Sequence, residues 1–163
     1  MSSRRKVVHE ETRNAAMLPS ILASLGLAEK PDLSDYEDDR IYRIHWALRV
    51  LKYSGFEAVA CYGFRRYFEG PFSSTLEQDL KAMHWREVAT APPIDDIRVT
   101  SVREAVQKGD DFLLALSIIV GVVDLNKGIS RDETLWMVDQ IRPECKHVAD
   151  EAYAFAEERI WPK

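Results

Sequence analysis

Cysteine is rare in this sequence and long apolar runs are absent, and each of these features excludes a class of protein. The two cysteines, Cys61 and Cys145, lie far apart and outside any C-x-x-C spacing, so no disulfide framework or zinc site is expected. Two free, buried thiols in a reducing cytosol are predicted instead. The longest apolar run, residues 112–123, is too short to span a bilayer. We therefore predict a buried helix there, no membrane span and a cytoplasmic location.

The signatures of common enzymes are also missing. The sequence has no G-x-S-x-G, no G-x-x-x-x-G-K-[ST], no G-x-G-x-x-G and no H-E-x-x-H, which mark hydrolases, phosphate loops, dinucleotide folds and zinc proteases. Glu144 and His147 form the one metal-like spacing, an E-x-x-H, but di-iron bundles need a second copy that this sequence lacks. We predict no enzymatic activity, no metal and no cofactor. A small metal-dependent enzyme is the least favoured alternative.

The chain has no excess of positive charge. It contains 22 Lys and Arg against 27 Asp and Glu in 163 residues, a net charge of −5, which disfavours phosphate binding over the whole surface. Apolar residues make up 46% and charged residues 30%, the balance of an ordinary soluble globular protein. At this length we expect one hydrophobic core. A protein partner is favoured, and nucleic acid bound by a local basic cluster is the alternative.

The first quarter of the chain divides into a helical arm and a connector. Residues 7–27 are predicted to be helical, in two pieces, with Pro19 opening the second piece and Gly26 closing it. Residues 29–39 are acidic and have no apolar period, which is typical of a surface connector. We therefore predict an N-terminal arm with its connector at residues 1–39 and a main helical domain at residues 40–163.

The main domain is expected to begin with a helix at residues 41–53. Its apolar residues recur at steps of three and four: Ile41, Ile44, Leu48 and Leu51. Four basic residues are expected mostly to face away from this stripe: Arg40, Arg43, Arg49 and Lys52. His45 lies beside the stripe, so we expect it to be packed or hydrogen-bonded rather than catalytic.

Residues 57–68 lose helical spacing and are rich in aromatic and β-favouring side chains. One extended strand, or a short hairpin turning near Gly63, is predicted there. Gly70 and Pro71 then end the extended segment, because proline cannot extend a central strand.

Within this segment, Arg65 and Arg66 are flanked by aromatic residues and are the best candidates for a binding surface. Exposed arginine beside aromatic side chains suits phosphates, bases or a protein hot spot. The competing interpretation, which we favour, is that the aromatic rings pack in the core and the arginines point outward. The candidate partner-binding or nucleic-acid-binding residues are Arg49, Lys52, Arg65, Arg66, Tyr67 and Phe72.

Capping boxes of the form S-x-x-E predict the starts of three helices, at Ser74, Ser101 and Ser130. In the first, the Ser74 hydroxyl is expected to accept a hydrogen bond from the Glu77 amide. An apolar helix is predicted between the second and third, at residues 111–125, and a final helix at residues 143–161. Residues 85–99 are expected to be irregular.

The most specific motif is F-E-G-P-F-S at residues 68–73, followed by Leu76, Asp79 and Leu80. It resembles the Tyr-Gly-Pro-Tyr-Ser centre of small prokaryotic proteins of the YwgA type and, more distantly, of the Panacea (SocA-like) group. The likeness spans about residues 40–143. His45 and Trp46 stand where those families often have glutamine and leucine.

The resemblance implies a mostly helical fold, winged-helix-like in some members, and no catalytic residues. It also implies a regulatory or protein-neutralising role near mobile elements, toxin–antitoxin loci or phage defence. We expect a mostly α domain with a small β element (α+β), with about six helices around one core. The expected function is non-enzymatic: a regulator, adaptor or antitoxin-like protein that binds another protein. A winged-helix DNA-binding regulator is the alternative, and the sequence assigns no oligomeric state.

Overall fold

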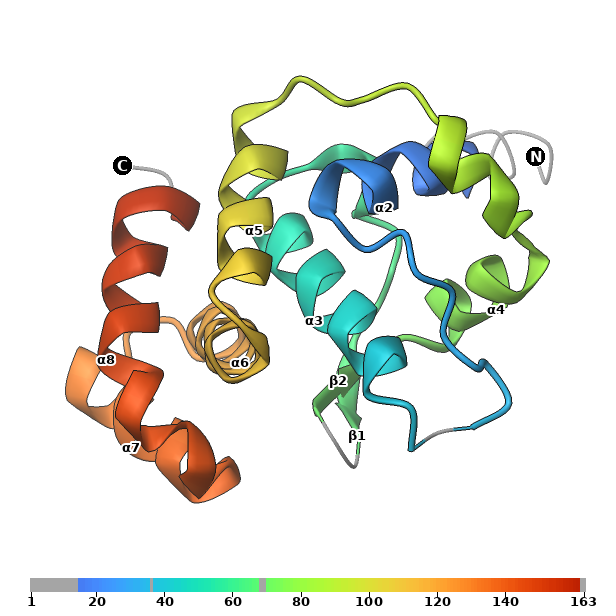
Figure 1. The fold of residues 1–163 in the computed structure, drawn as a ribbon. Helices are drawn as coiled ribbons and strands as arrows, with labels where there is room; N and C mark the ends of the chain where they lie inside the picture. The colour runs from blue at the N-terminus through green and yellow to red at the C-terminus, as the bar shows by residue number, and fades with distance from the viewer. Residues whose placement is uncertain (1–14, 36, 68–69, 162–163) are drawn as a thin grey trace, which may run out of the picture.

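Helices dominate the structure and are accompanied by one short hairpin (Figure 1). The computed structural model describes residues 15–35, 37–67 and 70–161, with the backbone alone at residues 66, 67 and 70. Seven α-helices and one two-stranded antiparallel sheet lie in this part of the chain, which confirms the expected mostly α fold with a small β element. The elements are η1 (Ala15–Met17), α2 (Leu18–Leu25), α3 (Asp39–Tyr53), η2 (Glu57–Val59), β1 (Arg65–Tyr67), β2 (Gly70–Phe72), α4 (Ser74–Ala82), η3 (Trp85–Thr90), α5 (Ile97–Gln107), α6 (Asp110–Leu125), α7 (Arg131–Ile141), η4 (Pro143–Cys145), α8 (Lys146–Phe155) and η5 (Ala156–Ile160).

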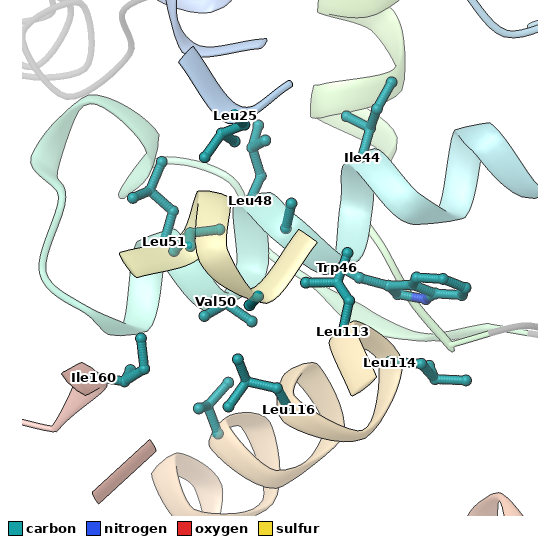
Figure 2. Packing of buried hydrophobic residues seen from close by; sticks show 14 of the residues in the cluster. Leu25, Ile44, Trp46, Leu48, Val50, Leu51, Leu113, Leu114, Leu116 and Ile160 are labelled. Atoms are coloured by element: carbon teal, nitrogen blue, oxygen red, sulfur yellow. The ribbon is translucent and has the colours of Figure 1, made fainter. Parts of the chain in front are cut away.

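The apolar helix α6 lies at the centre of the core. Every residue from 112 to 122 is buried, as the continuous apolar run predicted. Helices α3 and α8 pack along α6, and α7 packs against both α6 and α8. Figure 2 shows side chains from α2, α3 and α6 gathering in one cluster, with Ile160 of η5 at its edge. Among the described helices, none has the length and hydropathy to cross a bilayer.

Helix α2 belongs to the same core as the main body. Its inward side chains are at most 1% exposed: Leu18, Ile21, Leu22 and Leu25. It packs against α5 and η3, and the Ser24 hydroxyl accepts a hydrogen bond from the Ile94 amide at 2.9 Å. Gly26 closes the helix with a φ of +76°, as predicted. The second piece of the arm is therefore docked, whereas the first piece falls mostly outside the described residues.

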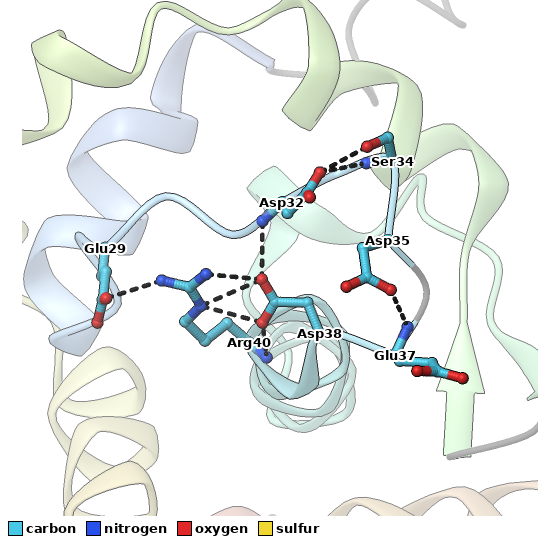
Figure 3. A network of polar contacts seen from close by, with 7 residues as sticks. All are labelled: Glu29, Asp32, Ser34, Asp35, Glu37, Asp38 and Arg40. Atoms are coloured by element: carbon cyan, nitrogen blue, oxygen red, sulfur yellow. Dashed lines mark hydrogen bonds and ion pairs between the residues drawn. The ribbon is translucent and has the colours of Figure 1, made fainter.

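The acidic connector is held together by its own hydrogen bonds (Figure 3). The Asp38 carboxylate accepts from the Asp32 amide at 2.8 Å and from the Arg40 amide at 3.0 Å, so it caps the start of α3. Arg40 also donates to Glu29 at 2.7 Å. Hydrogen bonds from the Arg40 guanidinium hold the pKa of Asp38 well below its usual range. Arg40 is thus engaged with carboxylates of the connector.

The hairpin lies further along the chain than the sequence predicted. Residues 57–59 form a 3₁₀ turn, and β1 pairs with β2 so that Arg66 lies opposite Pro71. The paired strands are therefore residues 65–67 and 70–72, so neither a turn near Gly63 nor one extended strand over residues 57–68 is correct. Pro71 is compatible with β2 because a strand of a two-stranded sheet has a free edge, where the missing N–H donor costs nothing.

Two of the three predicted N-cap residues are also wrong. The N-cap of α4 is Ser73, whose hydroxyl accepts from the Leu76 amide at 3.2 Å, and Ser74 is already helical. The N-cap of α5 is Asp96, which accepts from the Arg98 amide at 2.8 Å. Ser130 does cap α7, as predicted. A short carboxylate or hydroxyl at the correct backbone position outweighs a capping-box pattern that lies further along.

Candidate functional site

The basic residues of α3 are engaged within the fold instead of forming a free basic surface. Arg43 makes two hydrogen bonds to Asp110 at the start of α6, at 2.7 and 2.8 Å. The Lys52 ammonium donates to the Tyr62 carbonyl oxygen at 2.8 Å. Lys52 therefore ties α3 to the segment before the hairpin.

Arg49 is buried, although it is one of the basic residues expected mostly to face away from the apolar stripe. Only 9% of the residue is exposed, and its guanidinium lies directly over Gly121 of α6, where any Cβ would collide with it. The guanidinium carbon is 5.8 Å from the centre of the Tyr53 ring. Burial lowers the pKa of Arg49. The absence of a side chain at residue 121 is what makes room for this cation between α3 and α6.

The hairpin supplies the remaining candidate residues. Arg65 is exposed, while the side chains of Arg66 and Tyr67 lie outside the described part of the structure. Phe72 stacks on His45, with 4.4 Å between the ring centres, and packs against the core. Phe72 thus follows the favoured interpretation, in which the aromatic rings pack inward. The described side chains of the predicted set do not come together in one exposed site.

His45 is fully buried beneath the hairpin. Its Nδ1 accepts a hydrogen bond from the Ser73 amide at 3.1 Å, and Phe64 lies edge-on to its ring at 6.3 Å. Burial lowers the pKa of His45 to about 3, so the imidazole is neutral at physiological pH. As expected, the residue is packed and hydrogen-bonded, and it fixes the turn that leads into α4.

The metal-like spacing does not form a cluster of ligands. Glu144 and His147 are both exposed. Within the described residues, no group of three or more His, Cys, Asp and Glu side chains lies close enough to hold a metal ion. Cys145 is buried and Cys61 is partly buried. Burial raises the pKa of the Cys145 thiol, which leaves it protonated and unreactive.

A groove between α7 and α8 is a second candidate site, which the sequence did not single out. It has a volume of about 290 Å³ and is lined by Leu135, Trp136, Asp139, Lys146, Ala149 and Asp150. Trp136 is 64% exposed beside it. These six residues, together with Asp132 and Glu133, are called the α7–α8 face below. In Figure 1 the two helices lie side by side at the edge of the molecule, away from the hairpin.

Carboxylates surround Trp136 on its own helix. Asp132 and Glu133 precede it by four and three residues, and Asp139 follows by three, spacings that place side chains on the same side of a helix. Asp132 and Glu133 are exposed. Lys146 lies 3.9 Å from the Asp139 carboxylate. The face therefore combines an exposed indole with an acidic rim.

The sequence did contain a signal for this face. Thr134 and Val138, one turn apart, are fully buried and mark the inward side of α7. Trp136 lies two residues from each, about 200° around a helix with 3.6 residues per turn, so it must point away from the core. A large apolar residue opposite the buried stripe is the pattern that identifies an outward-facing aromatic anchor.

The hairpin and the α7–α8 face differ in how far their side chains are exposed to a partner. The described hairpin side chains pack mainly inward, whereas Trp136 is exposed beside an open groove. Comparisons of the chain with models of protein families, with curated proteins and with solved structures find no match.

Proposed function

We propose that this chain is a non-enzymatic protein-interaction module that regulates or neutralises another protein, in the manner of an adaptor or antitoxin, by binding it through the α7–α8 face. The observation that carries the proposal is Trp136, which is 64% exposed beside the groove. Tryptophan is among the residues most enriched in interface hot spots. Burying such a side chain stabilises a complex by about 1.5–3 kcal/mol.

The charges of the chain support a protein partner over nucleic acid. The net charge is −5, and Arg49 and Lys52, which were candidates for phosphate contacts, are respectively buried and bound to a backbone carbonyl. A protein that binds a polyanion needs cations free to meet phosphates. The α7–α8 face offers an apolar centre with a polar rim, which is the usual anatomy of a protein interface.

The proposal is tested by capturing partners with the tagged full-length chain in its native cell, with and without nuclease. Trp136→Ala removes the indole, and Ile97→Ala is the matched control, because Ile97 is 81% exposed on a different helix, α5. We expect one stoichiometric protein that survives nuclease, is lost by at least about tenfold with Trp136→Ala and is retained with Ile97→Ala.

Two results would contradict the proposal. Capture of the same protein in equal amount by Trp136→Ala would mean that another surface binds it. Recovery of nucleic acid alone, lost at raised salt, would favour the winged-helix DNA-binding regulator instead. Circular dichroism of both variants checks that each substitution leaves the fold intact.

A further inference from the structure

The last two helices carry an excess of negative charge. Residues 131–161 contain eight Asp and Glu and four Lys and Arg, a net charge of −4 out of −5 for the whole chain. The C-terminal layer formed by α7, α8 and the turns around them is therefore acidic, as is the connector at residues 29–39. Because long-range attraction depends on net charge, this layer attracts cationic partners.

The cations of this layer are already paired inside it or with a neighbouring helix. Arg131 contacts Asp150 at 2.7 Å, Arg142 contacts Glu144 at 3.2 Å, and Lys146 lies 3.9 Å from Asp139. Arg159 is paired with Glu104 of α5. Asp132 and Glu133, by contrast, have no ion pair among the described residues. The charge left free around Trp136 is thus negative.

An exposed indole with two free carboxylates one helical turn away is suited to bind a cation. The face of a tryptophan ring attracts ammonium and guanidinium groups, and tryptophan is the best aromatic side chain for this contact. Arginine is the better of the two ligands, since its planar guanidinium stacks on a ring while its N–H groups reach carboxylates. Trp136, with Asp132 and Glu133 one turn away, provides both kinds of contact.

Three residues that line the groove are apolar, two are acidic and one, which lies 3.9 Å from the Asp139 carboxylate, is basic: Leu135, Trp136 and Ala149, then Asp139 and Asp150, then Lys146. A groove between two helices that has an apolar floor and a charged rim fits the apolar side of an amphipathic helix. We infer that the α7–α8 face binds a basic amphipathic helix of the partner protein, with an arginine or lysine packed on Trp136. This inference rests on the proposed protein-binding function and names the chemistry of the partner.

A second copy of this chain fits the face less well. Two α7–α8 faces brought together would oppose two surfaces of residues 131–161 that each carry a net charge of −4. Like charges placed across an interface disfavour association. The acidic rim therefore selects a cationic partner over self-association.

The test measures binding of three labelled synthetic peptides to the full chain by fluorescence anisotropy. The first is an amphipathic helix of about 16 residues, long enough to approach helix stability, with leucine on one side and arginine on the other. The second has glutamate in place of every arginine. The third has the composition of the first in a scrambled order that destroys the apolar side.

We expect the arginine helix to bind at least about tenfold more tightly than the other two peptides, and to weaken as salt is raised. Trp136→Ala and the double variant Asp132→Asn/Glu133→Gln should each weaken it by about tenfold. The matched control is Asp95→Asn/Glu87→Gln, which removes the same charge at exposed positions outside α7 and α8 and should leave the affinity unchanged.

Each contrary outcome has a distinct meaning. If the arginine and glutamate helices bind equally well and both are lost with Trp136→Ala, the basic partner is overturned while the protein-binding function stands. If the arginine helix binds equally well to the Trp136→Ala and control variants, the assignment of this face is overturned. If the scrambled peptide binds as tightly as the helix, or if no peptide binds, the inference of an amphipathic helix is overturned, and the capture experiment still decides the proposed function.

Discussion

His45 shows how a single buried residue links stability to pH. Its side chain is fully buried and its pKa is lowered to about 3 by burial, against about 6.5 in the unfolded chain. The unfolded state therefore binds a proton below pH 6.5 that the folded state does not bind until about pH 3. The contribution of this residue to stability is complete above pH 6.5 and is lost as the pH falls.

Replacing His45 by Gln should therefore flatten the acid dependence of stability. We expect the free energy of unfolding of the wild type to fall by up to about 1.4 kcal/mol per pH unit more steeply than that of His45→Gln between pH 6 and 4. Urea denaturation across this range measures the slope. His84→Gln is the control, since His84 is exposed, and an equal slope for wild type and His45→Gln would contradict the prediction.

Gly121 and Arg49 give a second prediction at this scale. Alanine normally stabilises the interior of a helix relative to glycine by about 0.5–1 kcal/mol. At residue 121 a Cβ would collide with the Arg49 guanidinium, so Gly121→Ala should instead destabilise the protein by about 1–3 kcal/mol. Thermal unfolding measures the change. Gly63→Ala, where a Cβ meets nothing within 4 Å, should have a much smaller effect.

Residue types alone could predict the role of His45 but not that of Arg49. A histidine beside an apolar stripe is expected to point into the core together with the apolar side chains. An arginine beside the same stripe normally extends toward water, since its long stem lets the charge reach the surface. Arg49 is buried because a glycine 72 residues further along the chain, Gly121, leaves space for it. That space depends on how α3 crosses α6, which no local pattern contains.

At the scale of elements, the two adjacent serines at the start of α4 have different roles, Ser73 as the N-cap and Ser74 as the first helical residue. Ser73→Ala removes the hydroxyl that accepts from the Leu76 amide and should cost about 1 kcal/mol. Ser74→Ala, at an exposed position already inside the helix, should change the free energy of unfolding by much less. Chemical denaturation of the two variants gives the comparison, and a larger loss from Ser74→Ala would restore the capping box predicted from the sequence.

The elements that could be predicted from the sequence are those with sustained periodicity. Helices α3 and α6 appear within one or two residues of the predicted ranges, because their apolar side chains mark one buried face or a wholly buried run. The hairpin was misplaced because short strands are fixed by pairing and not by propensity. The α4 cap was misplaced by one residue because Ser73 and Ser74 offer the same hydroxyl in two registers.

At the scale of the whole molecule, α2 and the main body share one core. Leu22 of α2 and Leu116 of α6 are each fully buried. Replacing either by alanine should lower the midpoint of one common unfolding transition, at a cost of about 2–5 kcal/mol each. Calorimetry and circular dichroism should report the same transition. A separate low-temperature transition confined to Leu22→Ala would show that the arm unfolds independently.

The docking of α2 was beyond the reach of the sequence, as was the α7–α8 groove. A polar connector has the same kind of sequence whether the helix before it is docked or detached. The hydrogen bond between Ser24 and Ile94 joins residues 70 positions apart, which no local pattern reveals. The groove likewise arises from the packing of α7 on α8. Trp136 alone could have been found, from its place opposite Thr134 and Val138.

The contact between Arg49 and Gly121 also constrains how this protein can diverge. The two positions are coupled, because a side chain at 121 requires the guanidinium to move, and a shorter residue at 49 no longer fills the space over Gly121. Sequence drift should therefore alter the two positions together. Descendants that acquire alanine or serine at 121 are expected to carry a smaller, uncharged residue at 49. This paired exchange would indicate that they keep the same crossing of α3 and α6.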